Sequence, residues 1–361
     1  MSESAIVLTG ATGVVGMEVL ARLVEREEEV IVLLRAQDRA DAQGRLEATL
    51  ARLWDEPRAH RVTAFAADVT EPALGLTRTD RREIRSRADR IVHCAAAVGF
   101  DQSLPDALSI NALGSQRVLE LANDLDDLDR VVHVSTAFVA GRHDGVFRET
   151  DLALGQSFRN TYEQSKHLGE RLVAGSGLPV AIARPSIVVG DSTTGWTPAF
   201  SALYLPLRAY ALGLLDTVAA VADGVVDVVP LDYVAASLLQ LLDAPEAPGN
   251  TYHLVAGERA ATVADVLRLA QERFAQPRAA ITAAPRGAGT DALVPYFDVR
   301  TRFDDTASRA LLEPHGISSE PLDALFARLM DYAEETRWGR AGTTREAAAH
   351  ARAEHVLVEA A

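Results

Sequence analysis

The sequence has 361 residues, 48% hydrophobic and 24% charged, a balance typical of a globular protein with one large domain or two smaller ones. Its formal net charge of −15 argues against nucleic acid as the main partner, since phosphate binding needs a basic surface. The single cysteine, Cys94, excludes an internal disulfide and a cysteine-rich metal site, so we predict no metal and a reducing, cytoplasmic setting.

The start of the chain lacks the basic and then apolar segments of a signal peptide. The most apolar stretch, residues 202–222, is interrupted by a proline and by charged residues. We therefore expect no transmembrane segment. The sequence makes no prediction of the oligomeric state.

The first 190 residues alternate between short apolar runs and helical patterns. A helix is predicted directly after the first strand, through residue 24. The other expected elements are strands at 5–9, 30–34, 62–66, 89–94, 131–134 and 180–183, and helices at 40–54, 105–121 and 158–173. This alternation predicts a Rossmann-type α/β fold, a doubly wound parallel sheet that binds ligands at the carboxyl ends of its strands. We assign residues 1–190 to this nucleotide-binding domain.

A glycine-rich turn, Gly10-Ala11-Thr12-Gly13-Val14-Val15-Gly16, joins the first predicted strand to the first helix. Its three glycines suit a tight turn, the close approach of a pyrophosphate and the packing of helix on strand. The helix N-terminus adds free N–H groups and a partial positive charge. This context predicts a dinucleotide site.

The second strand ends in Arg35, where NAD enzymes usually carry an acidic residue for the ribose hydroxyls. A positive side chain suits the 2′-phosphate of NADP, and Arg39 and Arg45 follow shortly. We therefore favour NADPH over NADH. The alternative is that these arginines are simply solvated.

Tyr162 and Lys166 are four residues apart on a predicted helix, which places them on one face, one turn apart. A neighbouring ammonium favours phenolate, so we expect the pKa of Tyr162 to fall from about 10 toward working pH. Such a phenol can give a proton to a carbonyl oxygen as hydride arrives. Ser135 and Thr136 follow a predicted strand, and Thr136 is placed to hold the same oxygen.

Two polar residues near this pattern receive supporting roles. Asn111, on a predicted helix, is expected to brace the lysine through backbone or water, although a lone helix asparagine is usually a surface or capping residue. His93 is interpreted as a packed residue rather than a catalyst.

These motifs together resemble the extended short-chain dehydrogenase/reductase superfamily over roughly residues 4–260. The matching segments are TGATGVVG at 9–16, HCAAA at 93–97, Asn111, VSTAFVAG at 134–141, YEQSK at 162–166 and RPSIVVG at 184–190. The segments RPSIVVGDSTTGW at 184–196, GLL at 213–215 and VVDVVPLDYVA at 225–235 are most similar to the fatty acyl-CoA reductase and thioester reductase branch, which includes the terminal domains of carboxylic acid reductases. One departure from sugar-nucleotide relatives is Ala140, where they often carry tyrosine.

The resemblance implies a role for each matching residue. Thr136 would be the active-site hydroxyl, Tyr162 the proton donor, Lys166 its activator and ribose anchor, and Asn111 the asparagine of the proton relay. Gly10, Gly13 and Gly16 would line the phosphates, Arg35 the 2′-phosphate, and Asp68 the adenine. Further cofactor contacts are expected from Thr9, Thr12, Val14, Val15, Arg45, Val69, Ala95, Ala96, Pro185 and Ile187.

Residues 191–340 are predicted to form a smaller C-terminal substrate-binding lobe with elements that return to the sheet. We expect strands at 227–230 and 251–255, a loop at 282–295, and helices at 232–242 (capped by Asp232), 262–274 (capped by Thr262) and 321–338. The tail, 341–361, is expected to be a solvated helix or disordered. Apolar side chains of the lobe either line a site for an acyl chain or are simply core: Trp196, Phe200, Leu203 and Tyr204.

The expected function is NADPH-dependent reduction of an acyl thioester to the aldehyde, with a second hydride transfer giving the alcohol. Since the chain shows no adenylation or carrier region, the thioester is expected on coenzyme A or a separate carrier protein. The alternatives are a sugar-nucleotide epimerase or dehydratase, a hydroxysteroid-type dehydrogenase, and a non-catalytic NADP-sensing protein.

Overall fold

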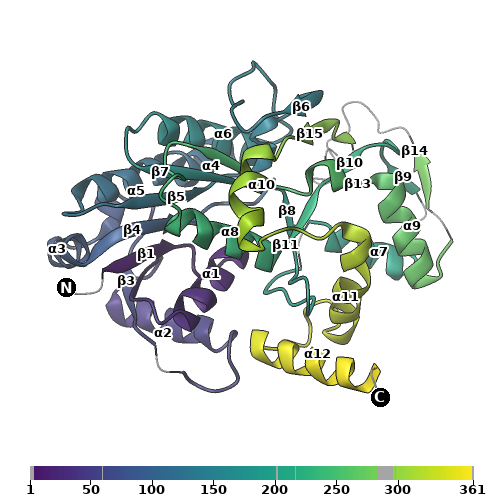
Figure 1. Ribbon diagram of the computed structural model, residues 1–361, viewed down its shortest axis with the longest axis horizontal. Helices are drawn as coiled ribbons and strands as arrows, with labels where there is room; N and C mark the ends of the chain where they lie inside the picture. Colours follow the sequence, from purple (N-terminus) through teal and green to yellow (C-terminus); the bar gives the residue numbers. More distant parts are fainter. Residues whose placement is uncertain are drawn as a thin grey trace.

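A parallel sheet of seven strands forms the centre of the molecule (Figure 1). The structure is a computed structural model that describes residues 4–58, 60–200, 202–215, 217–277, 279–282, 296 and 298–359. The strand order is β12-β7-β5-β4-β1-β2-β3. The strands are β1 (Ala5–Thr9), β2 (Val30–Leu34), β3 (Val62–Ala66), β4 (Ala88–His93), β5 (Arg130–Val134), β7 (Val180–Pro185) and β12 (Thr251–Leu254). The predicted Rossmann-type sheet is confirmed.

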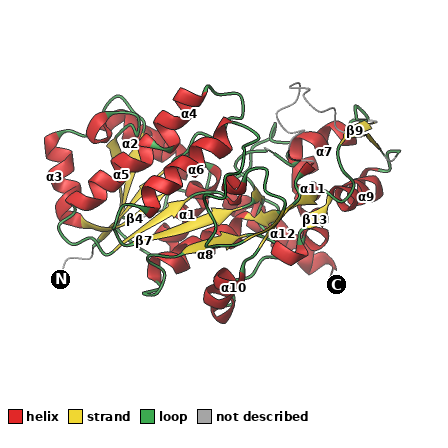
Figure 2. Ribbon diagram, turned by 90° about the horizontal axis from the view of Figure 1, so that it is seen from above, coloured by secondary structure: helices red, strands yellow, loops and turns green. Residues whose placement is uncertain are grey.

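Helices cover both faces of this sheet, which is why β1 and β2 are continuous apolar runs with every residue buried. One face carries α1 (Val14–Glu25), α2 (Arg39–Leu50) and α8 (Leu231–Asp243). The other carries α3 (Arg78–Arg87), α5 (Leu113–Asp124) and α6 (Thr161–Ala174), and Figure 2 shows α5 and α6 on the opposite side of the sheet from α8.

The predicted helix at 105–121 is two helices, α4 (Leu104–Asn111) and α5, separated at Ala112. The break lies where α6 comes close. A Cβ added to Gly169 of α6 would stand 2.3 Å from the Asn111 carbonyl oxygen. Helical periodicity alone does not reveal such a break, because apolar spacing continues across it.

The second half builds a smaller lobe from α7 (Tyr204–Ala211), α9 (Val263–Phe274) and α11 (Leu322–Glu335), at the right of Figure 1. It also returns β12 and α8 to the central sheet region. The remaining short strands lie in two-stranded pairs, and two of them, β6 and β8, come from the first 190 residues. The pairs are β8 (Ile187–Val189) with β11 (Val228–Pro230), β10 (Val225–Val226) with β13 (Ala261–Thr262), β9 (Thr217–Ala219) with β14 (Ala280–Thr282), and β6 (Gly145–Phe147) with β15 (Thr301–Phe303).

The predicted helix caps had different outcomes. Thr262 and Asp265 form the expected capping box at the start of α9. The prediction for Asp232 is wrong, because α8 begins after Pro230 and the Asp232 carboxylate accepts hydrogen bonds from Ser192 N and Oγ instead. The predicted loop at 282–295 lies outside the described residues, apart from Thr282, which ends β14.

The C-terminal tail contains a helix, α12 (Arg345–Glu359), in line with the first of the two expectations for it. The helix is anchored at its start. The Arg345 guanidinium donates to the carboxylates of Glu18 (2.7 Å) and Glu25 (2.6 Å) on α1, and Glu346 pairs with Arg58. Across the described residues, every helix falls short of the length and apolar character needed to cross a membrane.

Candidate active site

A cavity of about 350 Å³ lies at the carboxyl ends of β1, β4, β5 and β7, where the first half of the chain faces the lobe. Among the described residues, Lys166 is the one charged side chain that lines it. The lining consists of Gly10, Gly13, Val14, Val15, Gly16, Cys94, Ala96, Val98, Phe100, Val134, Ser135, Thr136, Phe138, Tyr162, Lys166, Pro185, Ser186, Ile187, Val188, Ala202, Leu203, Pro206, Val226 and Tyr296.

The glycine-rich turn forms one end of this cavity. Gly10 has a φ of +75°, and a Cβ there would lie 2.6 Å from Ala95 N. A Cβ on Gly16 would lie 2.2 Å from the Gly10 carbonyl oxygen, so this residue permits the close packing of α1 on the turn. Gly13 caps α1, and the first turn of the helix borders the cavity. The residues present therefore fit the pyrophosphate of a dinucleotide.

Tyr162 and Thr136 meet inside the cavity. Asn160 caps α6 by accepting a hydrogen bond from Glu163 N (2.9 Å), which places Tyr162 in the first turn of the helix. Thr136 follows β5 and lines the cavity together with Tyr162. Its hydroxyl donates to the Pro185 carbonyl oxygen (3.4 Å) and accepts from Phe138 N (3.3 Å), and it is near enough to the Tyr162 phenol to act on the pKa of that group as a hydrogen-bonding neighbour. Two hydroxyls thus converge where a substrate oxygen can accept from both.

The predicted lowering of the Tyr162 pKa by Lys166 is wrong. Burial raises the pKa of Tyr162 to about 12, and the hydrogen bond from Thr136 only partly opposes this. The Lys166 ammonium donates to the Val134 carbonyl oxygen (2.7 Å), and burial lowers its own pKa to about 8. The two side chains line the same cavity, as the spacing predicts, but desolvation dominates both groups.

Asn111 holds two segments of the site together. Its amide group pairs with both backbone groups of Ala97, accepting from N (2.8 Å) and donating to O (3.0 Å), and also donates to Ser165 Oγ (2.9 Å) on α6. The brace on Lys166 through backbone or water stays a prediction, and the side-chain hydrogen bond that Asn111 makes to α6 goes to Ser165, the neighbour of Lys166. The Asn111 carbonyl accepts from Ser115 Oγ (2.8 Å).

Thr9 and His93 lie buried beneath the turn. The Thr9 hydroxyl hydrogen-bonds His93 Nδ1 (2.7 Å) and accepts from Ala95 N (3.2 Å), so it holds the segment after β4 against β1. Burial lowers the pKa of His93 to about 3, so the ring is neutral. This placement agrees with the interpretation of His93 as a packed residue.

Several predicted cofactor residues lie outside the cavity lining, near the ends of β2 and β3. Arg35 is exposed, and its carbonyl accepts from Arg45 Nη1 (2.6 Å). Arg39 is occupied, since it pairs with Asp80 and Glu83 and stacks over Phe65. Asp68 accepts from Thr70 N and Oγ1, and the Val69 carbonyl accepts from Arg117. Thr12, which is exposed in the glycine-rich turn, and Ala95, which follows β4, also lie outside the lining.

Most of the lobe's contribution to the cavity was missed by the sequence reasoning. Leu203 lines the cavity as expected, but Trp196, Phe200 and Tyr204 do not, and Tyr204 instead packs in the core with its hydroxyl accepting from Gly190 N. The unpredicted lining residues from this half are Ala202, Pro206, Val226 and Tyr296. The sequence alone does not distinguish these lining residues from core residues, because both follow the same apolar pattern.

Tyr296 is the most informative of the missed residues. Its ring lies 5.1 Å from that of Phe138 and 5.2 Å from that of Phe100, and the Phe100 ring lies 6.0 Å from that of Tyr162. The Tyr296 hydroxyl accepts from Asn160 Nδ2 (2.9 Å), the side chain that caps α6. These rings therefore form an aromatic wall on one side of the Tyr162 side chain.

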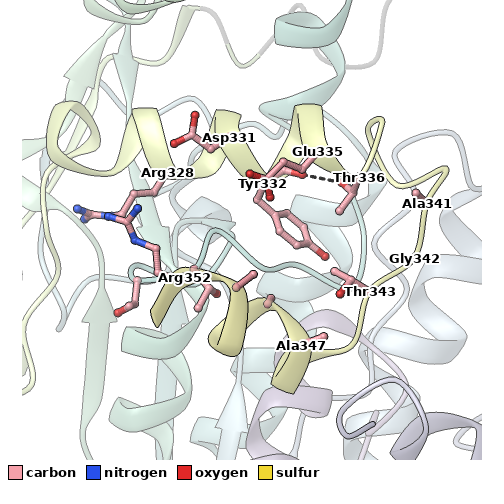
Figure 3. Close-up of a pocket in the computed structure, with 14 residues that line it drawn as sticks. Arg328, Asp331, Tyr332, Glu335, Thr336, Ala341, Gly342, Thr343, Ala347 and Arg352 are labelled. Atoms are coloured by element: carbon pink, nitrogen blue, oxygen red, sulfur yellow. Dashed lines mark hydrogen bonds between the residues drawn. The ribbon is translucent and has the colours of Figure 1, made fainter. Parts of the chain in front are cut away.

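A second cavity, of about 410 Å³, lies between α11 and α12 (Figure 3). None of the predicted site residues lines it. Arg328 and Arg352 share its lining with Asp331 and Glu335, so it does not present charge of one sign. The cavity beside Tyr162 is therefore the candidate active site.

The glycine turn, the strand-end threonine and the Tyr162/Lys166 pair on one parallel sheet define an extended short-chain dehydrogenase/reductase, a class of oxidoreductase that uses a nicotinamide cofactor. The model of a family described as "Male sterility protein" matches residues 8–238, more than half of the chain. The chain belongs to that family.

Known relatives and solved structures agree with this class. Human fatty acyl-CoA reductase 1 is 30% identical over 269 residues, covering 63% of this chain and 52% of that protein, so the chain spans about half the length of such curated relatives. The terminal R domain from the myxalamid PKS-NRPS biosynthetic pathway superposes with a TM-score of 0.80 at 25% identity, covering 95% of this chain and 93% of that one. The resemblance stated from the sequence is confirmed.

The fold is shared more widely. A UDP-glucuronic acid 4-epimerase from Bacillus cereus, in complex with NAD, superposes with a TM-score of 0.66 at 19% identity, covering 92% of this chain and 97% of that one. This likeness concerns the fold alone, so the choice between substrates rests on the site.

Proposed function

We propose that the protein reduces an acyl thioester to an aldehyde with NADPH. The observation that carries this proposal is the hydroxyl pair of Thr136 and Tyr162, which stands between the glycine turn and an apolar pocket that extends into the lobe. The likeness to fatty acyl-CoA reductases and to a terminal R domain supports it.

The reaction follows from the groups in the cavity. When bound, a reduced nicotinamide supplies hydride to the carbonyl carbon. The hydroxyls of Thr136 and Tyr162 hold the carbonyl oxygen as negative charge develops on it. Because the pKa of Tyr162 is about 12, the phenol is protonated at neutral pH and able to give its proton to this oxygen. The Lys166 ammonium, one helical turn away, then stabilises the phenolate.

The hemithioacetal formed in this step collapses to aldehyde and thiol. Its hydroxyl proton leaves with the sulfur, and the Tyr162 phenolate regains a proton from solvent, so each reduction consumes one hydride and one proton. A second hydride transfer to the aldehyde, from a second molecule of reduced cofactor and with the reprotonated phenol as donor, gives the alcohol. Asn111 supports this chemistry by fixing the segment after β4 against α6, the helix that carries Tyr162 and Lys166.

Two arginines at the end of β2 and nearby support NADPH over NADH. Arg35 is exposed at the strand end, and Arg45 bonds its carbonyl, so two cationic side chains stand where a ribose 2′-phosphate is expected. Asp68 lies at the neighbouring strand end, where the adenine is expected. The lone free cysteine, Cys94, supports a reducing, cytoplasmic setting.

A thioester on coenzyme A or a carrier protein suits the lobe side better than a sugar nucleotide does. Leu203, Pro206 and Val226 are apolar, and Lys166 alone among the described lining residues is charged. A sugar nucleotide needs partners for its diphosphate and hydroxyls, whereas an alkyl chain gains from apolar contact alone.

The proposal is tested by mixing the purified protein with acyl-CoAs of increasing chain length and either NADPH or NADH, and identifying the products. We expect NADPH-dependent release of thiol and formation of aldehyde or alcohol. A parallel reaction contains UDP-glucose and NAD. Turnover there, with no consumption of NADPH on any thioester, would support the epimerase alternative.

A further inference from the structure

We propose that Leu203, Pro206 and Val226 form a wall that sets the length of the acyl chain the enzyme accepts. This inference rests on the proposed thioester reduction. The inference comes from a small cavity of about 40 Å³ that lies directly behind the active-site cavity and is not the cavity of Figure 3. It is called the rear cavity below. Leu203, Pro206 and Val226 line both cavities, so they stand between the two.

The rear cavity is apolar throughout its described lining. The side chains behind the wall include Leu207, Val218, Val263 and Leu267, and the one hydroxyl nearby, on Tyr210, donates to the backbone carbonyls of Gln276 and Pro277 instead. A cavity of this kind has no partners for water and stays dry. It is also costly to keep, because an unfilled apolar space loses packing energy.

The wall lies on the path that a substrate chain would take. The carbonyl is fixed at one end by Thr136 and Tyr162, so the chain must extend toward the lobe, past Phe138 and Tyr296. Leu203 precedes α7, Pro206 lies in its first turn, and Val226 lies in β10. Because Thr136 and Tyr162 hold the substrate carbonyl and the wall stops the other end of the chain, the distance from the carbonyl to the wall limits the number of methylenes that fit.

The test compares two valine truncations that differ only in whether they open the wall. Val226→Ala removes a wall side chain and joins the two cavities. Val218→Ala enlarges the rear cavity and leaves the wall intact, so it is the matched control. Both valines are almost fully buried, at 4% and 7% exposure, so their cost to folding is similar. Melting temperatures and circular dichroism check that each variant folds.

For each variant, kcat/KM is measured across a series of saturated acyl-CoAs with NADPH. We expect Val226→Ala to move the optimum to longer chains, with a gain of about fourfold for each methylene newly accommodated. Leu203→Ala is expected to act in the same direction, and Val226→Phe to favour shorter chains. The optimum for Val218→Ala stays with the wild type.

A second readout does not depend on turnover. Stabilisation of the protein by saturated alcohols of increasing length, measured as a shift in melting temperature, should peak at a longer chain for Val226→Ala than for Val218→Ala. If both variants keep the wild-type optimum in both assays, the wall has no such role. If no variant reduces either an acyl-CoA or an acyl chain on a carrier protein while NADPH still binds, thioester reduction itself is refuted and the length limit with it.

Discussion

The two sides of the active-site cavity are built in different ways. The side formed by the first half carries the proposed reactive groups, Thr136, Tyr162 and Lys166, at a strand end of the large parallel sheet and on α6, which packs against it. The side formed by the lobe carries Leu203, Pro206 and Val226, from a helix start and a strand of two residues. The proposed catalytic groups thus lie on long, regular elements, whereas the side chains that shape the pocket lie on short, irregular ones.

Because the two sides are built differently, we expect catalytic turnover and substrate preference to respond differently to mutation. A hydroxyl or ammonium must be held within a fraction of an ångström, which a buried sheet provides. An apolar wall needs only to fill space, and substitutions of similar volume are tolerated there. We therefore expect mutations on the reactive side to abolish turnover, and mutations on the lobe side to change which substrate is turned over.

Tyr162→Phe should have the largest effect. It removes the proton donor and keeps the ring, so we expect kcat to fall by about 10²–10⁴ with the melting temperature nearly unchanged. The measurement is NADPH consumption with the best acyl-CoA. Tyr332→Phe is the control, since burial raises the pKa of Tyr332 to about 12 as well, yet it lines the cavity of Figure 3. Full activity in Tyr162→Phe would refute the catalytic role.

Arg35→Ala should act on the cofactor and leave the chemistry intact. Loss of a charge-assisted hydrogen bond to the 2′-phosphate is expected to raise KM for NADPH by about tenfold or more, and to leave KM for NADH unchanged. Arg39→Ala is the control from the same region, because that side chain is already paired with Asp80 and Glu83. Equal effects on the two cofactors would contradict the proposed contact.

The pH dependence of kcat should report Lys166. Burial lowers its pKa to about 8 and raises that of Tyr162 to about 12, so raising the pH removes the ammonium long before the phenol ionises. We expect activity to fall several-fold above about pH 8. Because the unfolded lysine titrates near 10.5, the unfolded chain binds more protons between these values, and the contribution of Lys166 to stability rises there. A fall in melting temperature that accompanies the lost activity would point to unfolding instead.

The smallest effect on turnover is expected from Arg345→Ala, far from both sides of the cavity. It removes a partner of Glu18, a carboxylate only 1% exposed on α1. We expect a loss of about 2 kcal/mol in the free energy of unfolding and less than a twofold change in kcat. Arg352→Ala, on the same helix, is the control, and denaturant unfolding is the measurement.

The sequence predicted that Thr136, Tyr162 and Lys166 lie together beside the glycine turn, because the signals for this placement are local. A glycine turn, a hydroxyl at a strand end and a Tyr/Lys pair at helical spacing each depend on neighbours in the chain. The strands of the central sheet follow from apolar runs in the same way. The pKa of Tyr162 was mispredicted because burial, which depends on the whole fold, outweighs the nearby charge.

In the second half, α8, α9 and α11 lie close to where the sequence predicts helices. The lobe's side of the cavity was not predicted, because the strands there are two or three residues long and pair over large sequence distances. Val226 pairs with Ala261, and Phe147 with Phe303. Apolar periodicity cannot identify such pairs or separate a pocket wall from a core. Trp196 and Tyr204, for which the sequence left both a pocket and a core position open, belong to the core, while Pro206 and Tyr296 line the cavity without any motif.

The most direct test of the proposed function follows the hydride itself. The protein is incubated with an acyl-CoA and NADPH that carries deuterium at the transferred position, and the product is analysed by mass spectrometry. The proposal predicts one deuterium on the former carbonyl carbon of the aldehyde, or two in the alcohol, with the label absent from the Tyr162→Phe reaction. Release of thiol with an unlabelled carboxylate as product would contradict it.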